Sequence, residues 1–268
     1  MNYIIVIILS IVQGITEFVP ISSSGHLVLL HNILPQININ ELAFDVVLHA
    51  GTLLAVLIFF LTDIKNILIA WFKNLVGGKL NQDAKLGWLI ILATIPAVLA
   101  GYFGENFIEQ NLRSDVVVVI MLIIVGILFL VVERLAKLQD DLGALNWKKS
   151  LFIGCAQALA LIPGTSRSGI TIIAGMSTKL KREAALRFSF LMSAVIILGA
   201  TIKKIPTMMV AISSGESLFS FVLGFLISFV VGYLVIKYFL IFIKEHSFVG
   251  FAYYRILLAL IIITSWLI

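Results

Sequence analysis

Six apolar runs dominate the sequence, and each is long enough to cross a bilayer. A membrane-spanning helix needs about 20 apolar residues, because the hydrocarbon core is about 30 Å thick. With 61% hydrophobic and 12% charged residues, the 268-residue chain has more apolar surface than a soluble core of this size can bury. We therefore predict an all-α integral membrane protein with spans at residues 42–61, 86–104, 115–133, 185–202, 218–243 and 250–268.

Two further apolar stretches, residues 3–34 and 150–176, are interrupted in the middle by Pro, Ser and Gly. Each half of such a stretch is too short to span a bilayer alone. Membranes tolerate broken helices where the irregular segment is buried in protein or lines a cavity. We therefore expect each stretch to form a re-entrant hairpin of two half-helices.

The two broken stretches resemble each other at a constant offset of 144 residues. Aligning Gln13 with Gln157 matches the polar residues of one break with those of the other, placing Ser22, Ser24 and Gly25 opposite Ser166, Ser168 and Gly169. A repeat of this size indicates duplication. We predict two repeats, residues 1–145 and 146–268, each with one hairpin and three spans, within a single membrane domain.

Three spans is an odd number, so the second repeat should be inverted relative to the first. The loops on one side carry most of the basic residues, namely Lys65, Lys73, Lys79, Lys85, Arg134, Lys137, Lys148, Lys149, Lys179, Lys181, Arg182 and Lys244, and the other side has Arg113, Lys203 and Lys204. The positive-inside rule makes the first side cytoplasmic and leaves both termini outside. The net charge of +5 is thus a topological signal, and we expect no nucleic-acid partner.

The break in the first hairpin, residues 13–26 (the first tip), contains an ionisable residue at membrane depth. Gln13 and Glu17 are four residues apart and share a helical face. A charge at the bilayer centre costs about 2.5–3.5 kcal/mol on insertion scales, so it is normally retained for a partner or a function. We expect Glu17 to be functional, with a structural pairing to an arginine as the alternative.

The break in the second hairpin, residues 163–171 (the second tip), has the composition of an anion site. Arg167 lies between Ser166 and Ser168 at the predicted start of a half-helix. Free backbone N–H groups, the positive end of a helix dipole and nearby glycines bind anions, and arginine matches phosphate oxygens in a bidentate manner. Phosphate is therefore the expected ligand class. Arg167 pairing with Glu17 to hold the tips together is an alternative compatible with it.

Four other features give weaker expectations. Asp45 and His49 share one face of the first span, and either contact the site or pack between helices. Arg255 is expected to snorkel from the cytoplasmic end of the last span. Glu183 and Arg187 are spaced as an ion pair on one helix face, and Cys155 is expected to be buried, as a free cysteine in an apolar run usually is.

At both tips the sequence resembles the bacterial undecaprenyl-diphosphate phosphatase family, BacA/UppP. The first motif of that family corresponds here to Gln13, Glu17, Pro20, Ser22, Ser23, Gly25 and His26, and the second to Pro163, Gly164, Ser166, Arg167, Ser168 and Thr171. The resemblance extends over the whole chain. It implies hydrolysis of undecaprenyl diphosphate to undecaprenyl phosphate and inorganic phosphate in the bacterial plasma membrane, which recycles the lipid carrier of peptidoglycan synthesis and confers bacitracin resistance.

The resemblance also implies roles for individual residues. We expect Glu17, His26, Arg167 and Ser23 to be catalytic, and the phosphate-binding residues to be Ser22, Ser24, Gly25, Gly164, Thr165, Ser166, Ser168 and Thr171. The family uses Mg²⁺ or Ca²⁺, for which Glu17 and Gln13 are the candidate ligands; Gln13 stands at an acidic position of the motif and contributes no charge. The nucleophile stays open between His26, Ser23 and a metal-bound water.

The same architecture leaves a second function open. Inverted repeats with broken helices meeting at the midplane also build many secondary transporters. A polyprenyl-phosphate flippase or an anion transporter is therefore the alternative to a phosphatase. The sequence does not decide the oligomeric state, and a homodimer is among the options.

Overall fold

The protein is almost entirely helical. The computed structural model describes residues 3–33, 41–112, 114–213 and 217–266, without the side chains of residues 28, 29, 31–33, 41, 42, 105 and 109. Within these ranges the chain forms eleven α-helices, two short 3-10 helices and no β-strand. The ends of the predicted hairpin at residue 34 and of the last span at residues 267–268, together with Arg113, lie outside the described residues.

The first half of the chain contains six α-helices. These are α1 (Tyr3–Thr16), α2 (Ser23–Ile33), α3 (Glu41–Phe59), α4 (Leu61–Leu75), α5 (Gln82–Asn111) and α6 (Asp115–Leu135). Helices α1 and α2 are the two halves of the first predicted hairpin. Helices α3, α5 and α6 overlap the three predicted spans.

The second half has a similar order of elements. After a 3-10 turn at Leu142–Ala144 come α7 (Trp147–Ala158), a second 3-10 turn (Leu159–Leu161), α8 (Arg167–Ser177), α9 (Arg182–Ser213), α10 (Leu218–Glu245) and α11 (Val249–Ser265). Within the described residues, α5, α6, α9 and α10 are long and apolar enough to cross a membrane alone. The chain is an all-α integral membrane protein.

The structure differs from the sequence prediction at α4, which occupies a segment expected to be a loop. The chain bends by 76° between α3 and α4. Ile67 and Ala70 of α4 are buried, whereas Leu68, Ile69 and Phe72 are exposed. Such an amphipathic helix is typical of the membrane interface. Charged residues interrupt its apolar residues, so this segment contains no apolar run long enough to predict a span.

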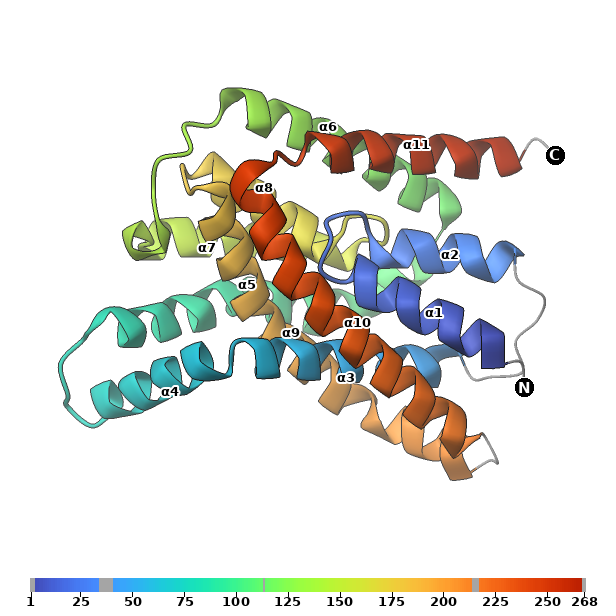
Figure 1. Ribbon diagram of the computed structural model, residues 1–268, viewed down its shortest axis with the longest axis horizontal. Coiled ribbons are helices and arrows are strands. Elements are labelled where there is room, and N and C mark those ends of the chain that lie inside the picture. The colour runs from blue at the N-terminus through green and yellow to red at the C-terminus, as the bar shows by residue number, and fades with distance from the viewer. Residues whose placement is uncertain (1–2, 34–40, 113, 214–216, 267–268) are drawn as a thin grey trace.

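Corresponding helices of the two halves run in opposite directions. In Figure 1, α3 runs towards the end of the molecule that carries α4, whereas α9 runs away from it; α6 and α11 are related in the same way. The halves also interlock, because α1 packs on α10 of the second half and α7 packs on α5 of the first. This is the arrangement of an inverted repeat. The boundary between residues 145 and 146 stays a prediction.

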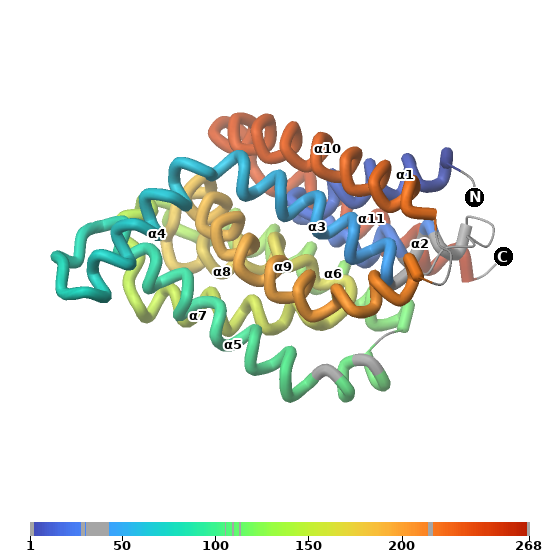
Figure 2. Tube along the Cα trace, turned by 90° about the horizontal axis from the view of Figure 1, so that it is seen from below, coloured from blue at the N-terminus to red at the C-terminus, as the bar shows by residue number. Residues whose placement is uncertain are grey.

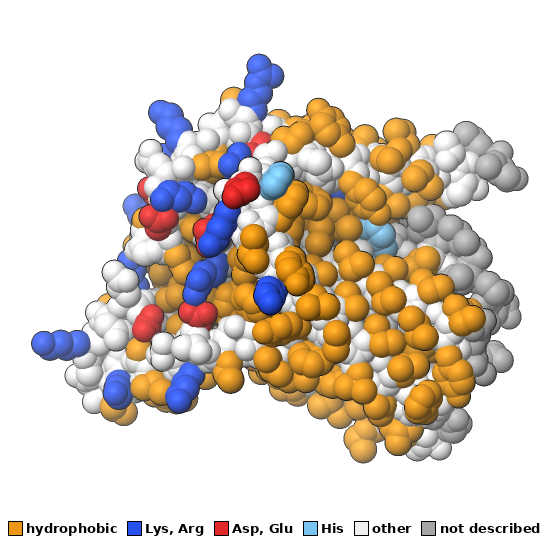
Figure 3. Space-filling model, viewed as in Figure 1, with side chains coloured by type: hydrophobic (Ala, Val, Ile, Leu, Met, Phe, Trp, Pro, Cys, Tyr) orange, Lys and Arg blue, Asp and Glu red, His pale blue; other side chains and the backbone are white. Residues whose placement is uncertain are grey.

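Charged residues gather at one end of the molecule. Figure 3 shows the Lys, Arg, Asp and Glu side chains of the visible face concentrated at the end that carries α4, while the remainder is mainly hydrophobic. At that end Arg182 makes a bidentate bond to Glu133, with Nε donating to Oε1 at 2.9 Å and Nη2 to Oε2 at 2.5 Å. Helix α1 begins and α11 ends at the opposite end, as Figures 1 and 2 both show. The start of α1 and the end of α11 therefore lie opposite the basic loops.

Two of the weaker expectations were wrong. Arg187 pairs with Asp63 at 2.5 Å, and Glu183 pairs with Lys244 at 3.5 Å, so Glu183 and Arg187 each find a partner on another helix. Cys155 is exposed instead of buried. Helix α7 lies at the periphery, where an apolar side chain meets lipid and needs no protein contact.

Candidate active site

The two tips contain the same turn in atomic detail. Ser22 and Ser166 have positive φ angles of 75° and 69°. Their Oγ atoms accept hydrogen bonds from the N–H groups of Gly25 at 3.2 Å and Gly169 at 3.1 Å. Positive φ costs a non-glycine residue about 1–3 kcal/mol, so surrounding contacts must hold both turns. Helices α2 and α8 therefore begin at matching serine caps, 144 residues apart, as the sequence alignment predicted.

The tips also touch each other. The Gly164 N–H donates to the Ser24 Oγ at 3.1 Å, which joins the second tip to the first. Gly164 has a φ of 87°, and a Cβ atom there would lie 2.5 Å from the Val118 carbonyl oxygen of α6. Only glycine fits this position. The starts of α2 and α8, with their positive dipole ends, are therefore brought to one place.

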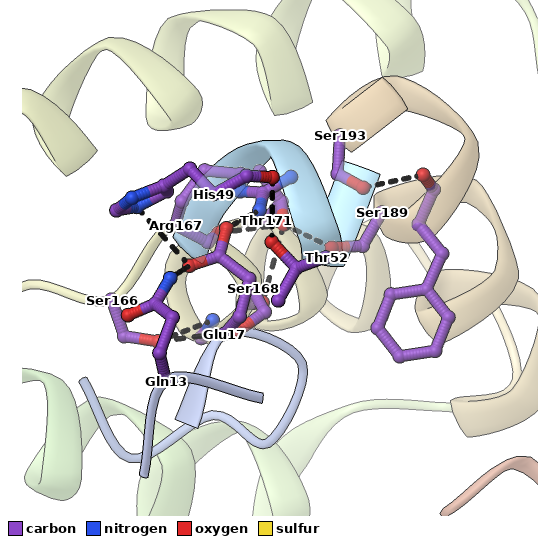
Figure 4. A network of polar contacts seen from close by, with 12 residues as sticks. Gln13, Glu17, His49, Thr52, Ser166, Arg167, Ser168, Thr171, Ser189 and Ser193 are labelled. Atoms are coloured by element: carbon purple, nitrogen blue, oxygen red, sulfur yellow. Dashed lines mark hydrogen bonds and ion pairs between the residues drawn. The ribbon is translucent and has the colours of Figure 1, made fainter. Parts of the chain in front are cut away.

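A buried ion pair connects the tips beside this contact. Arg167 Nη2 lies 2.5 Å from Glu17 Oε1, and Gln13 Nε2 donates to Glu17 Oε2 at 3.0 Å. His49 Nε2 of α3 lies 3.6 Å from the same Oε2. Figure 4 shows Glu17 surrounded by Gln13, Arg167 and His49. The predicted pairing of Glu17 with Arg167 is present.

Two buried polar atoms at this ion pair have no hydrogen-bond partner. They are Arg167 Nη1, a donor, and Gln13 Oε1, an acceptor. Leaving such groups unsatisfied costs about 1–3 kcal/mol each, more where one is charged. A free guanidinium donor suits an anionic oxygen, and a free amide oxygen suits a cation or a donor. The site can therefore accept a ligand that presents an anionic oxygen to Arg167 and a cation or a hydrogen-bond donor to Gln13.

The predicted phosphate-binding threonines use their hydroxyl groups within the protein. Thr165 Oγ1 donates to the Ile162 carbonyl at 2.7 Å. Thr171 Oγ1 donates to the Arg167 carbonyl at 2.8 Å and is bonded to Ser189 Oγ of α9 at 2.7 Å. These contacts support the backbone of the second tip. A direct phosphate contact of either threonine stays a prediction.

A cavity of about 260 Å³ adjoins the tips. Its walls are formed by residues of α2, α3 and α9, namely Ser23, Ser24, Leu27, Asp45, Val46, His49, Ala200, Thr201 and Lys204. His49 and Ser24 connect it to the ion pair and to the contact between the tips. Its lining residues on α3 belong to the first half of that helix, and α3 starts at the end of the molecule opposite α4, as Figure 2 shows. A second cavity, about 300 Å³ at the basic end around Asp63 and Arg187, includes no residue of either tip.

The chain is similar to known proteins of one family over nearly its whole length. Residues 6–261 match the family described as Bacitracin resistance protein BacA. An undecaprenyl-diphosphatase of Alteromonas mediterranea is 42% identical over 258 residues, which cover 96% of each chain. One of Rubrobacter xylanophilus is 43% identical over 262 residues, covering 96% of this chain and 95% of its own. This chain belongs to the BacA family.

In this BacA-family chain, the structure separates His26 from the ion pair. His26 Nδ1 donates to the Ser22 carbonyl at 2.7 Å, and Nε2 lies 2.7 Å from the Tyr254 hydroxyl of α11. Both ring nitrogens therefore have partners. Among the described contacts, no hydrogen bond or ion pair joins His26 to Glu17, Arg167 or Ser23.

His49 reaches the centre of the site, where the sequence had left its role undecided. Its Nδ1 donates to the Asp45 carbonyl at 2.7 Å, which directs Nε2 towards Glu17. Its side chain is 37% exposed, in the cavity. The spacing of Asp45 and His49 indicated that both lie on one face of α3. It did not indicate that this face meets Glu17.

Arg255 was expected to snorkel, and this was wrong. It is 0% exposed and hydrogen-bonds to backbone carbonyls of both tips, including Pro20 at 3.2 Å and Gly164 at 2.9 Å. Helix α11 starts at Val249, so Arg255 lies about 9 Å along its axis, at 1.5 Å per residue. The side chain therefore points into the protein towards the tips. The sequence signal for this buried role was an arginine in an apolar span with no acidic residue near it.

The residues at the ion pair fit a hard cation only in part. Gln13 Oε1 and the Glu17 carboxylate are oxygen donors of the type that Mg²⁺ and Ca²⁺ prefer. Within the described residues, no cluster of three or more His, Cys, Asp or Glu side chains is present. The chain thus offers one carboxylate and one amide oxygen. Such a set suits a metal that also binds ligand phosphate oxygens, because the protein supplies too few donors to hold it alone.

Proposed function

We propose that this chain hydrolyses undecaprenyl diphosphate to undecaprenyl phosphate and inorganic phosphate, the reaction for which its relatives are named. The observation that carries the proposal is the buried Arg167 beside two converging helix starts, with one guanidinium nitrogen left without a partner. A charged phosphate group satisfies that donor and meets two positive helix ends. The apolar surface of the surrounding helices suits a ligand with a long hydrocarbon tail.

Arg167 and the first turns of α2 and α8 would bind the diphosphate. The first N–H groups of a helix have no intrahelical partner, and here only Gly25 and Gly169 are capped by serine oxygens. The remaining first-turn N–H groups are available to phosphate oxygens. Phosphoryl transfer depends mainly on positioning and on stabilising the charge of the transferred group, which is what such a cradle supplies.

Ser23 is the favoured nucleophile among the three candidates. It lines the cavity next to the contact between the tips, and it starts α2. His26 has both nitrogens bonded and does not line that cavity. Ser23 Oγ would attack the terminal phosphorus, forming a phosphoserine, releasing its proton to solvent and breaking the bridging P–O bond so that undecaprenyl phosphate leaves with the bridging oxygen. Water would then hydrolyse the phosphoserine to serine and inorganic phosphate. A phosphorylated serine trapped in a single turnover supports this route, and its absence favours direct attack by water.

A divalent cation would bind at Gln13 and Glu17 together with the diphosphate. Held by these two residues, the cation would supply charge neutralisation to the diphosphate. Glu17 is held by Arg167, Gln13 and His49, so its carboxylate is oriented before the ligand arrives. Its task would be to position charge, with Arg167 Nη2 staying on Glu17 while Nη1 meets the phosphate.

The site would face the outside of the bacterial plasma membrane. The basic loops lie opposite the start of α1 and the end of α11, and the positive-inside rule places basic loops in the cytoplasm. The 260 Å³ cavity is lined by the first half of α3, which starts at the same end of the molecule as α1. Recycling of the lipid carrier for peptidoglycan synthesis would begin from diphosphate that reaches this side. Bacitracin resistance, the trait in the family description, would follow from the same activity.

The decisive experiment measures phosphate release from undecaprenyl diphosphate by the purified chain in detergent, with Mg²⁺, with Ca²⁺ and with excess chelator. Arg167→Ala should lower kcat about 1,000-fold, because an arginine that stabilises a phosphoryl group contributes about 10³–10⁵. Arg187→Ala, which removes an arginine paired with Asp63 at the basic end, is the matched control and should stay near wild type.

Two outcomes would contradict the proposal. Activity of Arg167→Ala within a few-fold of wild type would reject the phosphate-binding role of that arginine. An inactive wild-type chain that moves polyprenyl phosphate or an anion across vesicles would instead support the transporter. Unchanged activity in chelator would remove the metal from the mechanism and leave the remaining assignments in place.

A further inference from the structure

Two neighbouring residues of α11 contact the tips, Arg255 both of them and Tyr254 the first, although α11 belongs to neither. Arg255 is fully buried and donates only to backbone carbonyls: Leu122, Pro20, Met121, Gly164 and Thr165, at 2.9–3.4 Å. The hydroxyl of Tyr254 lies 2.7 Å from His26 Nε2, and the two rings are parallel within 5°. One helix therefore contacts α6, the first tip and the second tip at once.

The contacts of Arg255 differ from those of an ordinary buried arginine. In the described part of the chain no carboxylate pairs with it, and every bond goes to a main-chain oxygen. Burying an arginine without a counter-ion is expensive, and structures retain such groups for a function. Five donors in one rigid plane can join carbonyls of three separate segments. Its contacts hold main-chain segments in place, and no side chain is among them.

The bonds to the tips fix the orientation of their peptide planes. The C=O of one residue and the N–H of the next lie in one planar trans peptide and point in opposite directions. Because Arg255 Nη2 binds the Thr165 carbonyl at 3.1 Å, the N–H of Ser166 points away from Arg255. The bond to the Gly164 carbonyl orders the preceding peptide in the same way. The backbone N–H groups at the start of α8 are therefore oriented before a ligand binds.

The same bonds lie beside the two strained serines. Thr165 immediately precedes Ser166, and Pro20 is two residues before Ser22, the residues with positive φ. His26 Nδ1 binds the carbonyl of Ser22 itself, and Tyr254 holds the other side of that imidazole. Backbone strain of this kind persists only where neighbouring contacts enforce it. Helix α11 makes contacts of this kind at both tips.

We propose that Arg255 and Tyr254 are positioning residues of the phosphatase reaction: Arg255 holds the backbone of both tips, and Tyr254 holds His26, in the arrangement that receives the diphosphate. The inference rests on the proposed function for its kinetic test but has a second readout that does not need catalysis. Neither residue touches the ion pair of Glu17 and Arg167, so their effect is indirect.

Lysine should not replace Arg255. A lysine ammonium has three donors on a flexible stem and cannot present a planar fork to carbonyls of three segments. Arg255→Lys should lower kcat for undecaprenyl diphosphate about 100-fold, the cost of misplacing a reacting group by about 1 Å. KM should change less than about threefold, because Arg255 binds only main-chain carbonyls and the ion pair of Arg167 with Glu17 is left in place. Arg187→Lys on α9 is the matched control and should keep wild-type kinetics.

Hydrogen–deuterium exchange separates local positioning from general destabilisation. In purified full-length Arg255→Lys, peptides that cover residues 13–26 and 159–171 should exchange at least about tenfold faster than in wild type. Peptides from α5 and α10, which do not contact Arg255, should be unchanged. Faster exchange throughout the chain, or no change at the tips, would overturn the proposal.

Tyr254→Phe provides the milder variant, because it removes one hydroxyl and keeps the ring. It should lower kcat about tenfold through loss of the bond to His26, whereas Tyr253→Phe on the exposed neighbour should have no effect. If Arg255→Lys cannot be recovered folded, Tyr254→Phe decides: wild-type kinetics and unchanged exchange at residues 13–26 would overturn the proposal. An inactive wild-type chain would reject the phosphatase function separately, since the exchange result does not depend on catalysis.

Discussion

Three buried polar residues show how the site tolerates charge inside the membrane. Arg167 is compensated by Glu17, yet retains one nitrogen without a partner. Arg255 is compensated only by carbonyls. The free-energy cost of burying a charge is offset when its hydrogen-bonding groups are satisfied. When one partner of a buried pair is removed, the other charge stays buried without compensation. The unsatisfied nitrogen of Arg167 is therefore the group with most to gain from an incoming phosphate.

His49 provides a test of how Glu17 is oriented. His49→Ala should lower kcat/KM about tenfold, because loss of one contact to a buried carboxylate costs about 1–1.5 kcal/mol. His49→Gln should retain activity within about threefold, since an amide N–H can still meet the carboxylate. Steady-state phosphate release is the measurement, with His246→Ala at an exposed loop position as the control. Equal losses in the Ala and Gln variants would show that the imidazole itself is needed.

At the scale of elements, short helices are positioned by long ones. Helices α2 and α8 have eleven residues each and begin in the protein interior. Helix α2 packs on α1 and α6, and α8 packs on α6, α7 and α9, so these neighbours hold the free N–H groups of both helices at the tips. Close crossing of the long helices depends on small residues, as is usual where lipid provides no hydrophobic drive between helices. At Gly51 the backbone of α3 meets α10 closely.

Gly51→Ala should destabilise the protein. A Cβ atom there would lie 2.1 Å from Ser228 Oγ and 2.5 Å from the Phe225 carbonyl oxygen, so the backbone of α10 must shift. Overpacking of this kind costs about 1–3 kcal/mol. Gly199→Ala in α9 is the matched control: nothing lies within 4 Å of its Cβ, and alanine favours a helix by up to about 1 kcal/mol. Thermal unfolding in detergent should show a lower midpoint for Gly51→Ala alone, and equal midpoints would contradict the packing argument.

At the scale of the whole molecule, duplication and inversion bring the tips together. The two hairpins enter from opposite sides, so that Ser24 of the first bonds the Gly164 N–H of the second. The halves then differ in chemistry, since Glu17 has no acidic counterpart at residue 161, which is Leu161. Symmetry accounts for the matching serine caps, and the side chains that differ between the halves make the ion pair.

The orientation in the membrane can be tested by labelling single cysteines in a Cys155→Ala background, because Cys155 is itself exposed. Ser265→Cys, at the end of α11, should react with a membrane-impermeant maleimide from outside the plasma membrane. Lys79→Cys, between α4 and α5, should react only after the membrane is opened. The reverse pattern would place the cavity of Ser23 and His49 on the cytoplasmic side.

The sequence by itself determined the helical membrane class, the long spans, the duplication and the residues of both tips. These are local properties: an apolar run has to be long enough for a bilayer, and basic loops have to stay on one side. The serine turns at Ser22 and Ser166 could be aligned because the repeat preserves their spacing.

Only the tertiary structure decided which distant residues meet there. Arg255 binds carbonyls 90 and 235 residues away, and His49 reaches Glu17 from a different helix. Helix α4 is likewise stabilised by packing against α5. Charged residues interrupt its apolar residues in the sequence, so its apolar face appears only once the helix is formed. A buried charge is stabilised by whichever partners the packing brings to it. Those partners are set by how the helices cross, and one helix's sequence does not contain that information.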